Sequence, residues 1–498
     1  MSVVWQGLFT ALSPTSLLMV LVGVFVGIIV GIVPGVGAGV GLTLLLPLIF
    51  TMKPVLGLML LLALWAADGY GASITSILIN VPGGAGAVAT CFDGYPMAKQ
   101  GRAGEAIGIS MASSMVAGII GTAALMLVAP PVAKLAVDIG PAEYTILSIL
   151  GMTLIGGLSS KEPIKGLISA VIGLMTSFIG YDLVTGFVRY NFGTQYLFDG
   201  VDLEVALVGF FAIASLVDAG QEGGTVAQLG KATGSVWKGF MEAFRRPVSV
   251  IRSSLVGVIL GAMPGIGISL ASMAAYDVEK RASKHPEEFG NGAVEGVIGP
   301  EAANNSCQPA ALIPTLTLGI PAGSTSAVFL GALIMYGISP GIGLFQDKSA
   351  LVWALMWGIM IASIAYVVVG LAFAGFFAKV TLLPIEYLVP ITLVTSFIGA
   401  YSGANNNYWD IVVALAFGVL GYMMTVLKYP VAPAVLGVVL GPKLEKNYFT
   451  ALLMSDGSRK IFFESPLAIV LWILLALVIF GPYVTRAIRK SRAAGSAA

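Results

Sequence analysis

Two short Pro-Gly-X-Gly motifs are the residues of this sequence best suited to bind an ion. They are Pro34-Gly35-Val36-Gly37 and Pro264-Gly265-Ile266-Gly267. Proline removes a backbone donor and glycine relaxes the steric limits on φ and ψ, so a helix stops at each motif and another begins. A helix start exposes unpaired N–H groups and the positive end of a dipole, which bind an anion without an arginine. At either motif alone, the alternative is a kink needed only for packing. We expect an anion site lined by both motifs: Pro34, Gly35, Gly37, Pro264, Gly265 and Gly267.

A second pair of segments is rich in hydroxyl and amide groups. Such groups and free N–H donors can hold a carboxylate, while carbonyls freed by unwinding can hold Na⁺. The alternative is that the serines and threonines bond back to their own helices. We expect a Na⁺ site near Asn80 and Asn304. The residues expected to bind substrate in these segments are Ser76, Asn80, Pro82, Gly83, Gly84, Asn304, Asn305, Pro321, Gly323, Ser324 and Thr325.

Two acidic residues lie within apolar sequence and are candidates for coupling an ion. Ionisable groups at membrane depth are costly and so point to function. Asp68 stands between apolar stretches, where it could couple protons or cations or sit at a membrane interface. Glu301 stands just before Asn304 and Asn305, where it could complete a cation site or cap a helix start.

The composition is that of a membrane protein. Of the 498 residues, 57% are hydrophobic and 10% are charged, and the mean hydropathy is +0.94, whereas soluble domains carry roughly 25% charged residues. Sixty-three glycines and 25 prolines suit membrane helices, several of them broken. About twelve to fourteen segments could span or half-span a bilayer. A net charge of +1 gives no reason to expect nucleic acid.

The two halves of the sequence repeat each other. The spacing between matching motifs is about 230 to 243 residues, which indicates an internal duplication. Basic residues favour opposite loops in the two halves, so we expect an inverted pair. The predicted repeats are 1–235 and 236–498. The matching motifs are Gly31–Gly37 with Gly261–Gly267, Leu78–Gly83 with Leu318–Gly323, and Pro141–Tyr144 with Pro384–Tyr387.

An enzyme is not expected from these residues. The only histidine, His285, lies in a charged loop, and Cys91 and Cys307 have no metal-ligating neighbours at a suitable spacing. The sequence contains no Walker loop, so energy must come from an ion gradient or a partner. We expect no catalytic residues and no cofactor other than Na⁺ or H⁺ as the coupling ion.

The two ends of the sequence bear on its orientation. Met1–Thr15 lacks the basic region and small-residue cleavage site of a signal peptide, so no cleaved segment is expected. Arg486–Arg492 holds four basic residues after an apolar span. The positive-inside rule therefore predicts a cytoplasmic C-terminus.

Two motifs of the sequence are specific to one family: DGYPMAKQG at Asp93–Gly101 and PEAANN at Pro300–Asn305. On these motifs, and over nearly its whole length, the chain resembles the TctA-type permeases, the large subunits of the tripartite tricarboxylate transporters. After Pro82-Gly83, the Gly84-Ala85 pair departs from the family pattern, which leaves the substrate open. The segments that carry the resemblance are Gly31–Pro47, Gly69–Gly104, Gly180–Asp202, Pro300–Asn305, Leu312–Leu333 and Gly421–Pro442.

The resemblance implies a three-part system in a bacterial inner membrane. Its partners would be a small TctB-like membrane subunit and a periplasmic TctC-like solute-binding protein, and a homodimer is left open. The substrate would be a carboxylate such as citrate or a related di- or monocarboxylate, driven by Na⁺ or H⁺. The mechanism would be elevator-like, with transport-domain elements at about 20–130 and 255–345 moving past a scaffold.

We therefore expect an all-α polytopic protein of about twelve transmembrane or half-spanning segments. They would form two inverted repeats with broken helices or re-entrant hairpins, and the protein would act as a secondary transporter. The alternatives are an ion channel or scaffold, which a continuous polar lining would favour, and an intramembrane enzyme using Glu301 or Asp68 as an acid.

Overall fold

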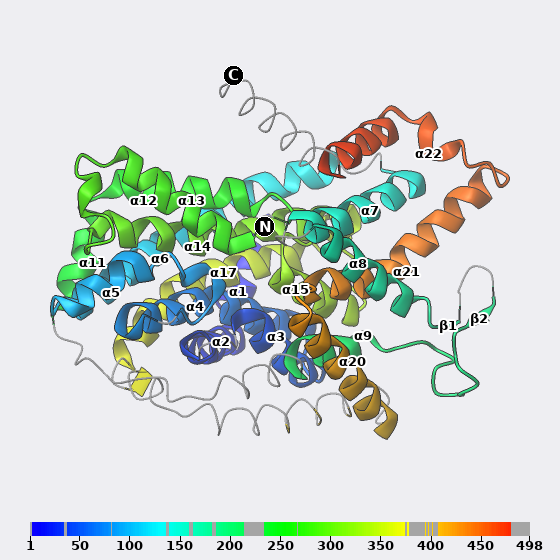
Figure 1. The fold of residues 1–498 in the computed structure, drawn as a ribbon, viewed down its shortest axis with the longest axis horizontal. Coiled ribbons are helices and arrows are strands. Elements are labelled where there is room, and N and C mark those ends of the chain that lie inside the picture. The colour runs from blue at the N-terminus through cyan, green and yellow to red at the C-terminus, as the bar shows by residue number, and fades with distance from the viewer. Residues whose placement is uncertain are drawn as a thin grey trace, which may run out of the picture. The chain divides into compact units, whose positions relative to one another are not determined.

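Helices make up nearly all of the regular structure in the computed structural model (Figure 1). Expected residues outside the described ranges include Pro34, Gly35, the Pro384–Tyr387 motif and the basic segment Arg486–Arg492. The described residues are 2–33, 37–80, 82–135, 139–158, 163–181, 186–213, 234–265, 267–373, 376–377, 394, 397, 401 and 407–479.

The chain forms two units. The first contains residues 1–136 and 202–423, and the second contains residues 137–201 and 424–498. In the first unit the elements are α1 (Val3–Ala11), α2 (Pro14–Ile32), α3 (Gly37–Phe50), α4 (Pro54–Ile79), η1 (Ala85–Ala87), α5 (Cys91–Lys99), α6 (Ala103–Leu135), α9 (Leu203–Leu207), η3 (Val208–Ile213), α11 (Val236–Phe244), α12 (Pro247–Gly261), α13 (Gly267–Ala282), η4 (Pro286–Glu288), α14 (Val294–Leu318), α15 (Ser324–Met335), α16 (Ile342–Asp347) and α17 (Ser349–Ala372).

The second unit is smaller. Its two short strands pair antiparallel, with Gly180 opposite Arg189. Arg189 forms a bidentate ion pair with Glu445, at 2.6 and 2.8 Å. The helix α20 (Tyr408–Val426) begins in the first unit and ends in the second. The elements of the second unit are α7 (Pro141–Leu158), α8 (Pro163–Ser177), β1 (Gly180–Tyr181), β2 (Val188–Arg189), α21 (Val431–Met454) and α22 (Ile461–Glu464).

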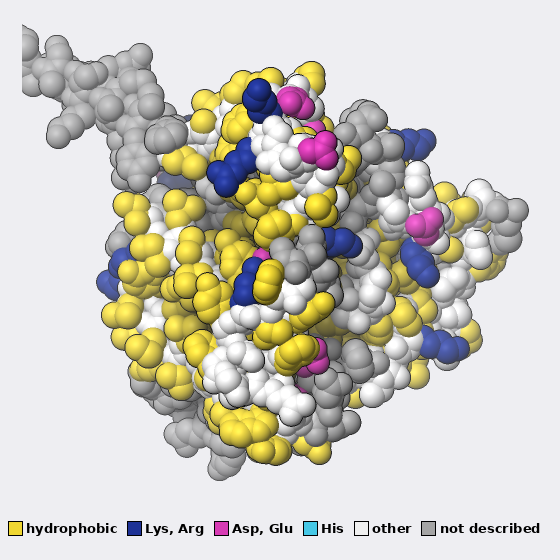
Figure 2. Space-filling view, turned by 90° about the vertical axis from the view of Figure 1, so that its right-hand side faces the viewer, with side chains coloured by type: hydrophobic (Ala, Val, Ile, Leu, Met, Phe, Trp, Pro, Cys, Tyr) yellow, Lys and Arg dark blue, Asp and Glu magenta, His cyan; other side chains and the backbone are white. Residues whose placement is uncertain are grey.

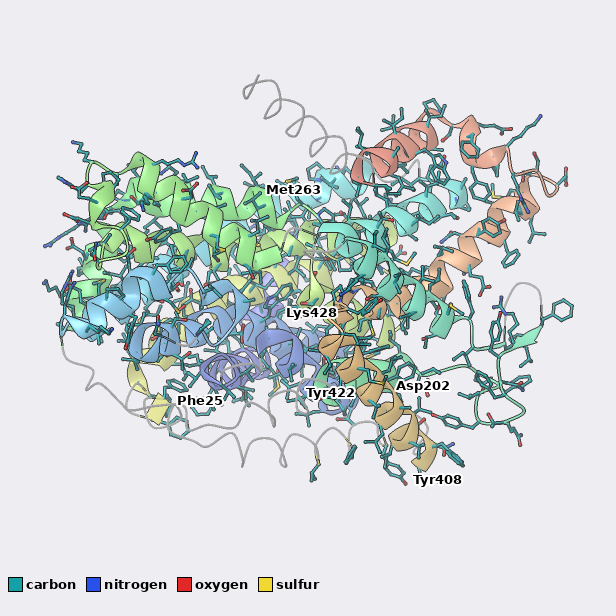
Figure 3. The ribbon with its side chains drawn as sticks, in the orientation of Figure 1. Phe25, Asp202, Met263, Tyr408, Tyr422 and Lys428 are labelled. Atoms are coloured by element: carbon teal, nitrogen blue, oxygen red, sulfur yellow. The ribbon has the colours of Figure 1, made fainter. Side chains whose placement is uncertain are left out.

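Five helices among the described residues are long and apolar enough to cross a membrane. The predicted total of about twelve spanning or half-spanning segments remains a prediction, as does the elevator arrangement. Hydrophobic side chains predominate on the face drawn in Figure 2, with scattered charges. Phe25 of α2, labelled in Figure 3, packs on the rings of Phe373 and Phe376 with centroids 5.4 and 5.6 Å away. The candidate spans are Pro14–Ile32, Pro54–Leu78, Ala103–Lys134, Ser349–Ala372 and Tyr408–Val426.

Helix α14 lies at the centre of the first unit. Every residue from Gly296 to Thr317 is buried, because α14 packs against α4, α6, α12 and α13. It contains Pro300, Pro309 and Pro314 and still runs unbroken. Neighbouring helices in a buried site can satisfy the backbone groups that proline frees.

The irregular segments are shorter than the sequence suggests. The runs 34–50, 69–95, 264–275 and 300–330 are apolar yet rich in Gly, Pro, Ser, Thr and Asn, a pattern that predicts re-entrant or unwound backbone. Instead α3 begins at Gly37, α4 continues to Ile79, and α14 continues to Leu318. Packing against neighbouring helices can satisfy the backbone groups that proline and glycine leave unpaired, so the breaks are limited to a few residues each.

Candidate functional site

The α2–α4 helix pair of the first half is repeated by the α12–α14 pair of the second. A methyl group added at Gly27 would lie 2.3 Å from the carbonyl oxygen of Leu64, and one at Gly31 would lie 2.2 Å from that of Asp68. The corresponding distances are 2.4 Å from Gly257 to Ala303 and 2.6 Å from Gly261 to Cys307. Glycine is required for this close approach of helix backbones. The same packing register therefore occurs in both helix pairs, and the internal duplication itself stays a prediction. The inverted orientation and the 235/236 boundary remain predictions.

The helix that follows each Pro-Gly-X-Gly motif begins in the same way. Gly37 and Gly267 are the first residues of α3 and α13, and their φ angles are +60° and +75°. Such angles favour glycine. No described residue lies within 4 Å of a methyl group added at either position. Among the described residues nothing fills the space at either helix start, which leaves room for an anion.

Asn80 ends helix α4. Its φ angle is +59°, and it corresponds to Gly319, which ends α14 with φ +70°. Each stands two residues before a proline, Pro82 or Pro321. Asparagine tolerates the left-handed conformation better than most residues. The backbone alone thus accounts for the residue type at position 80, and the exposed Asn80 side chain is free for another role.

Within each half the two backbone breaks contact one another, and the halves approach each other where a methyl group at Gly86 would lie 2.6 Å from Ile268 Cγ2. The N–H of Gly265 donates to the carbonyl of Ala322 at 3.0 Å. A methyl group at Gly83 would lie 1.9 Å from the carbonyl of Gly31, and one at Gly39 would lie 3.8 Å from Thr325 Oγ1. The predicted residues Pro82–Gly84 and Pro321–Thr325 therefore belong to one region with the starts of α3 and α13.

The start of α15 is also open. Gly323 adjoins unfilled space, and its N–H donates to Ser326 Oγ at 2.8 Å. Ser324 is exposed and Thr325 half-buried. Ser76, by contrast, is fully buried and donates to the carbonyl of Ala72 in its own helix at 3.0 Å. The Ser76 hydroxyl is therefore bonded within its own helix, which was the alternative to a role in binding substrate.

Asn304 and Asn305 are buried where α14 crosses α4. A methyl group at Gly69 would lie 2.9 Å from Asn305 Oδ1, 2.9 Å from Gln308 Nε2 and 3.0 Å from Asn304 Nδ2. The three amides therefore fill the space that the missing side chain of Gly69 leaves. Asn304 also reaches η1, since its Oδ1 would lie 2.3 Å from a methyl group at Gly86.

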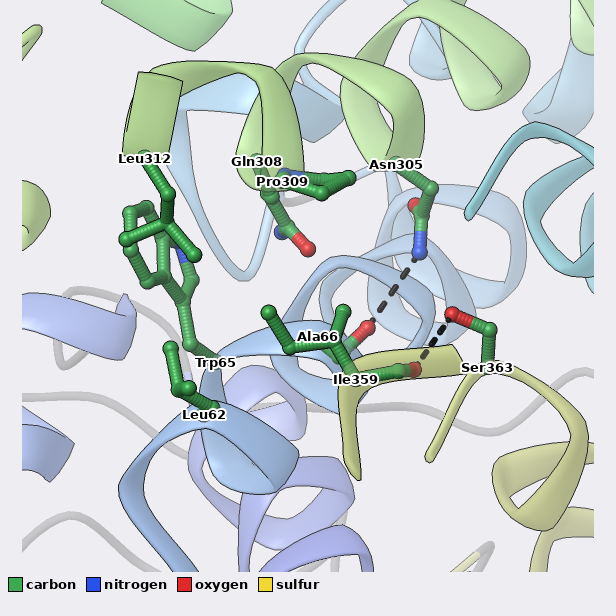
Figure 4. Close-up of a pocket in the computed structure, with 9 residues that line it drawn as sticks. All are labelled: Leu62, Trp65, Ala66, Asn305, Gln308, Pro309, Leu312, Ile359 and Ser363. Atoms are coloured by element: carbon green, nitrogen blue, oxygen red, sulfur yellow. Dashed lines mark hydrogen bonds between the residues drawn. The ribbon is translucent and has the colours of Figure 1, made fainter. Parts of the chain in front are cut away.

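A small cavity lies beside this crossing (Figure 4). Its volume is about 10 Å³, enough for one water molecule. Trp65 Nε1, Asn305 Oδ1 and Gln308 Oε1 have no hydrogen-bond partner among the described residues. Asn305 Nδ2 donates to the carbonyl of Ala66 at 3.3 Å, as Figure 4 shows. The lining residues are Leu62, Trp65, Ala66, Asn305, Gln308, Pro309, Leu312, Ile359 and Ser363.

Glu301 is enclosed by four hydroxyl groups. Ser73 and Thr90 donate to its Oε1, the former at 2.6 Å. Ser110 and Ser114 donate to its Oε2 at 2.7 and 3.1 Å. Glu301 is fully buried and lies in the third turn of α14, so it does not cap a helix start, and that alternative is wrong. We call Glu301 with these four residues the hydroxyl cage.

Asp68 has far fewer partners. It is 7% exposed and approaches the backbone N–H of Ala38, in the first turn of α3. Its Oδ1 has no hydrogen-bond partner among the described residues. A negative side chain near a helix start is favoured by the helix dipole. The residue therefore belongs to the first break, and one of its oxygens is open.

Sequence reasoning missed the role of Asp93 in the DGYPMAKQG motif. Its Oδ1 accepts from the N–H groups of Gly290, Gly292 and Ala293 at 2.8 to 2.9 Å. The Tyr276 hydroxyl donates to Oδ2 at 2.9 Å. Asp93 thus fixes the loop before α14 to α5. The only available signal was the aspartate itself within a polar, glycine-containing motif.

Ion pairs gather where α5, α6, α11, α12 and α14 begin or end. Arg102 and Lys238 pair with Glu105 at 2.9 and 3.3 Å. Arg246 pairs with Glu242 and, at 2.7 Å, with Glu295. The hydrogen bond from Arg246 lowers the pKa of Glu242. Glu295 is therefore part of a structural network, and we call these residues the charged end.

A protein-family model described as the tripartite tricarboxylate transporter TctA family matches residues 17–436. A relative from Agrobacterium vitis, named "Uncharacterized 52.8 kDa protein in TAR-I ttuC' 3'region", is 38% identical over 463 residues, which are 93% of this chain and 92% of the relative. A second relative from Agrobacterium vitis, "Uncharacterized protein in TAR-II ttuC' 3'region", is 41% identical over 212 residues, which are 43% of this chain and 87% of that relative. No solved structure matches.

Proposed function

The chain belongs to the tripartite tricarboxylate transporter TctA family, and from this premise we propose that it imports a carboxylate in a binding-protein-dependent system. The family is one of transporters, so the chain is the large subunit of such a system. The finer proposal is a secondary transporter coupled to Na⁺ or H⁺, in a bacterial inner membrane, with a cytoplasmic C-terminus. Its proposed partners are the small membrane subunit and the periplasmic solute-binding protein.

The observation that carries the proposal is the convergence of the backbone breaks. No described residue lies within 4 Å of a methyl group added at Gly37, Gly267 or Gly323, at the starts of α3, α13 and α15, and the two breaks of each half contact one another. N–H groups and dipoles at helix starts favour a negatively charged ligand. In transporters with broken helices, such starts typically hold the carboxylate of the substrate. Substrate movement past a scaffold, as in an elevator, remains part of the proposal.

The general test is uptake of radiolabelled citrate by proteoliposomes that contain this chain and its small subunit. Uptake is measured with and without the solute-binding protein, under imposed Na⁺ or H⁺ gradients. We expect uptake that needs the binding protein and one of the gradients. Absence of uptake for citrate and for a panel of di- and monocarboxylates would overturn the proposed function.

Gly323 offers a sharper test of the site. Its φ angle of −166° suits any residue, and a side chain there meets open space. Gly323→Asp places a carboxylate at the N-cap of α15, where it stabilises the helix but repels an anionic substrate. Gly323→Asn provides the same cap without charge. We expect the Asp variant to lose about tenfold or more in uptake relative to the Asn variant. Equal uptake by the two would remove this helix start from the substrate site.

A further inference from the structure

The two halves differ at one equivalent position. Asp68 on α4 and Cys307 on α14 hold the same place, because their carbonyls face the equivalent glycines Gly31 and Gly261 at 2.2 and 2.6 Å. The same register one turn earlier, at Gly27 and Gly257, excludes a local coincidence. The first break therefore has a carboxyl group where the second has a neutral thiol.

Asp68 lacks a neutralising partner among the described residues. No ion pair to it occurs there. Helices α2 and α3, which face it through Gly31 and Ala38, contain no acidic or basic residue. On α4 and α17 the other titratable side chains are Tyr70 and Tyr366, and on α14 they are Glu295, Glu301 and Cys307. A buried carboxylate without a counter-charge is unfavourable.

We propose that Asp68 binds and releases the coupling cation, Na⁺ or H⁺, at the first break, which is the start of α3, and that the substrate carboxylate binds at the second, which comprises the starts of α13 and α15. At the start of α3 the Asp68 carboxyl itself takes the place that the helix dipole offers to a negative group. This inference rests on the proposed function. The open Oδ1 of Asp68 provides the cation with an oxygen that no described residue occupies. At the second break the residue equivalent to Asp68 is Cys307, which carries no carboxylate, so the dipole at the start of α13 attracts an anion.

The hydroxyl cage explains why Glu301 is not assigned this role. A carboxylate has about four lone-pair sites, and four hydroxyls occupy them in this structure. A cation would have to displace hydrogen bonds that join α14 to α4 and α6. Asp68 presents no such obstacle at Oδ1. Glu301 is therefore a positioning residue for the helix crossing.

The arrangement also explains coupling. The start of α3 lies near the start of α15, since a methyl group added at Gly39 would lie 3.8 Å from Thr325 Oγ1. An ionised Asp68 without its cation repels an anionic substrate at the start of α15. A bound cation removes this repulsion, so each ligand raises the affinity for the other by the same factor.

The test compares wild type with Asp68→Asn in proteoliposomes that also hold the small subunit and receive the binding protein. One arm imposes a Na⁺ gradient at equal pH, and another imposes a pH gradient without Na⁺, which distinguishes the two cations. A third measures exchange of radiolabelled for unlabelled citrate with equal cations on both sides. We expect Asp68→Asn to lose about tenfold or more in gradient-driven accumulation and to retain exchange.

Three outcomes would overturn the inference. They are wild-type accumulation by Asp68→Asn, loss of exchange together with accumulation in a variant of normal abundance, and loss of coupling in Glu301→Gln but not in Asp68→Asn. Asp68→Glu is the second variant, because it keeps a carboxyl on a longer stem. We expect it to remain coupled with a shift of about threefold or more in the cation concentration for half-maximal uptake. An unchanged midpoint would contradict the assignment.

A separate readout does not need citrate to be the substrate. A ligand that binds only the folded protein raises its melting temperature. Replacing choline chloride with NaCl, or lowering the pH, should raise the melting temperature of the wild-type protein more than that of Asp68→Asn. Equal responses would contradict the inference even if the wild type transports citrate. A wild type that responds but transports no carboxylate would overturn the proposed function alone.

Discussion

Asp68 and Glu301 are both buried carboxyls on helices that cross near the centre of the first unit, yet their surroundings are opposite. Glu301 is held by four hydroxyls from outside its own helix. Asp68 has an oxygen without a partner among the described residues. Burial alone would rank them alike. The difference shows that the number of bonded partners separates a carboxyl that holds helices together from one that can exchange a ligand.

The largest expected effect is the loss of Glu301. Glu301→Ala would leave four buried hydroxyls without their shared acceptor, which should lower the free energy of unfolding by about 3 kcal/mol or more. Glu301→Gln keeps an acceptor oxygen and should lower it less. The measurement is the melting temperature and folded yield in detergent. A Glu301→Ala variant as stable as the wild type would show that Glu301 does not hold these helices together.

Asp93 is a third buried carboxyl, and both of its oxygens accept hydrogen bonds. It accepts three backbone N–H groups and the Tyr276 hydroxyl, so it should resemble Glu301 and not Asp68. Asp93→Ala should lower the free energy of unfolding by about 2 to 3 kcal/mol without removing the cation dependence of transport. Tyr276→Phe is the matched control, with a loss of about 1 kcal/mol. Uncoupled transport by a stable Asp93 variant would show that a full set of hydrogen-bond partners does not mark a buried carboxyl as structural.

Asp68→Asn should change the free energy of unfolding in the opposite direction. The change removes a buried charge that lacks a counter-charge, so in cation-free buffer at neutral pH the free energy of unfolding should stay the same or rise by about 1 kcal/mol. Thermal unfolding of this variant beside Glu301→Gln provides the contrast. A clear destabilisation by Asp68→Asn would indicate that Asp68 is a structural residue.

The smallest effect is expected at the charged end, where water screens the ion pairs. Because the folded pKa of Glu242 is lowered by its bond to Arg246, its stabilising contribution is present above the unfolded value of about 4.3. It is lost as the pH falls through the folded value. Glu242→Gln should therefore change stability by about 1 kcal/mol or less at neutral pH and weaken the fall in melting temperature on acidification. An identical pH profile would rule out this contribution.

The sequence allowed some of the site to be predicted. The breaks at Pro264 and Pro321, and the positions of Gly267 and Gly323 at helix starts, follow from the local chemistry of proline and glycine. The residues at which each break begins and ends could not be predicted in this way. Pro300, Pro309 and Pro314, for example, lie inside a helix that its neighbours keep intact.

The site features that could not be predicted depend on contacts between residues far apart in the sequence. The Glu301 cage joins residues 187 to 228 positions apart, and isolated Ser73 or Ser114 carries no local sign of such a contact. Asn80 was expected to bind substrate or Na⁺, whereas its left-handed backbone also makes it the end of α4. The roles of the predicted substrate residues as ligands remain proposals.

The most direct test of the central claim is the cation dependence of citrate accumulation in proteoliposomes, measured side by side for the wild type, Asp68→Asn and Glu301→Gln. We expect gradient-driven accumulation by the wild type and by the folded fraction of Glu301→Gln, and exchange without accumulation by Asp68→Asn. Undiminished gradient-driven accumulation by Asp68→Asn would contradict the central claim.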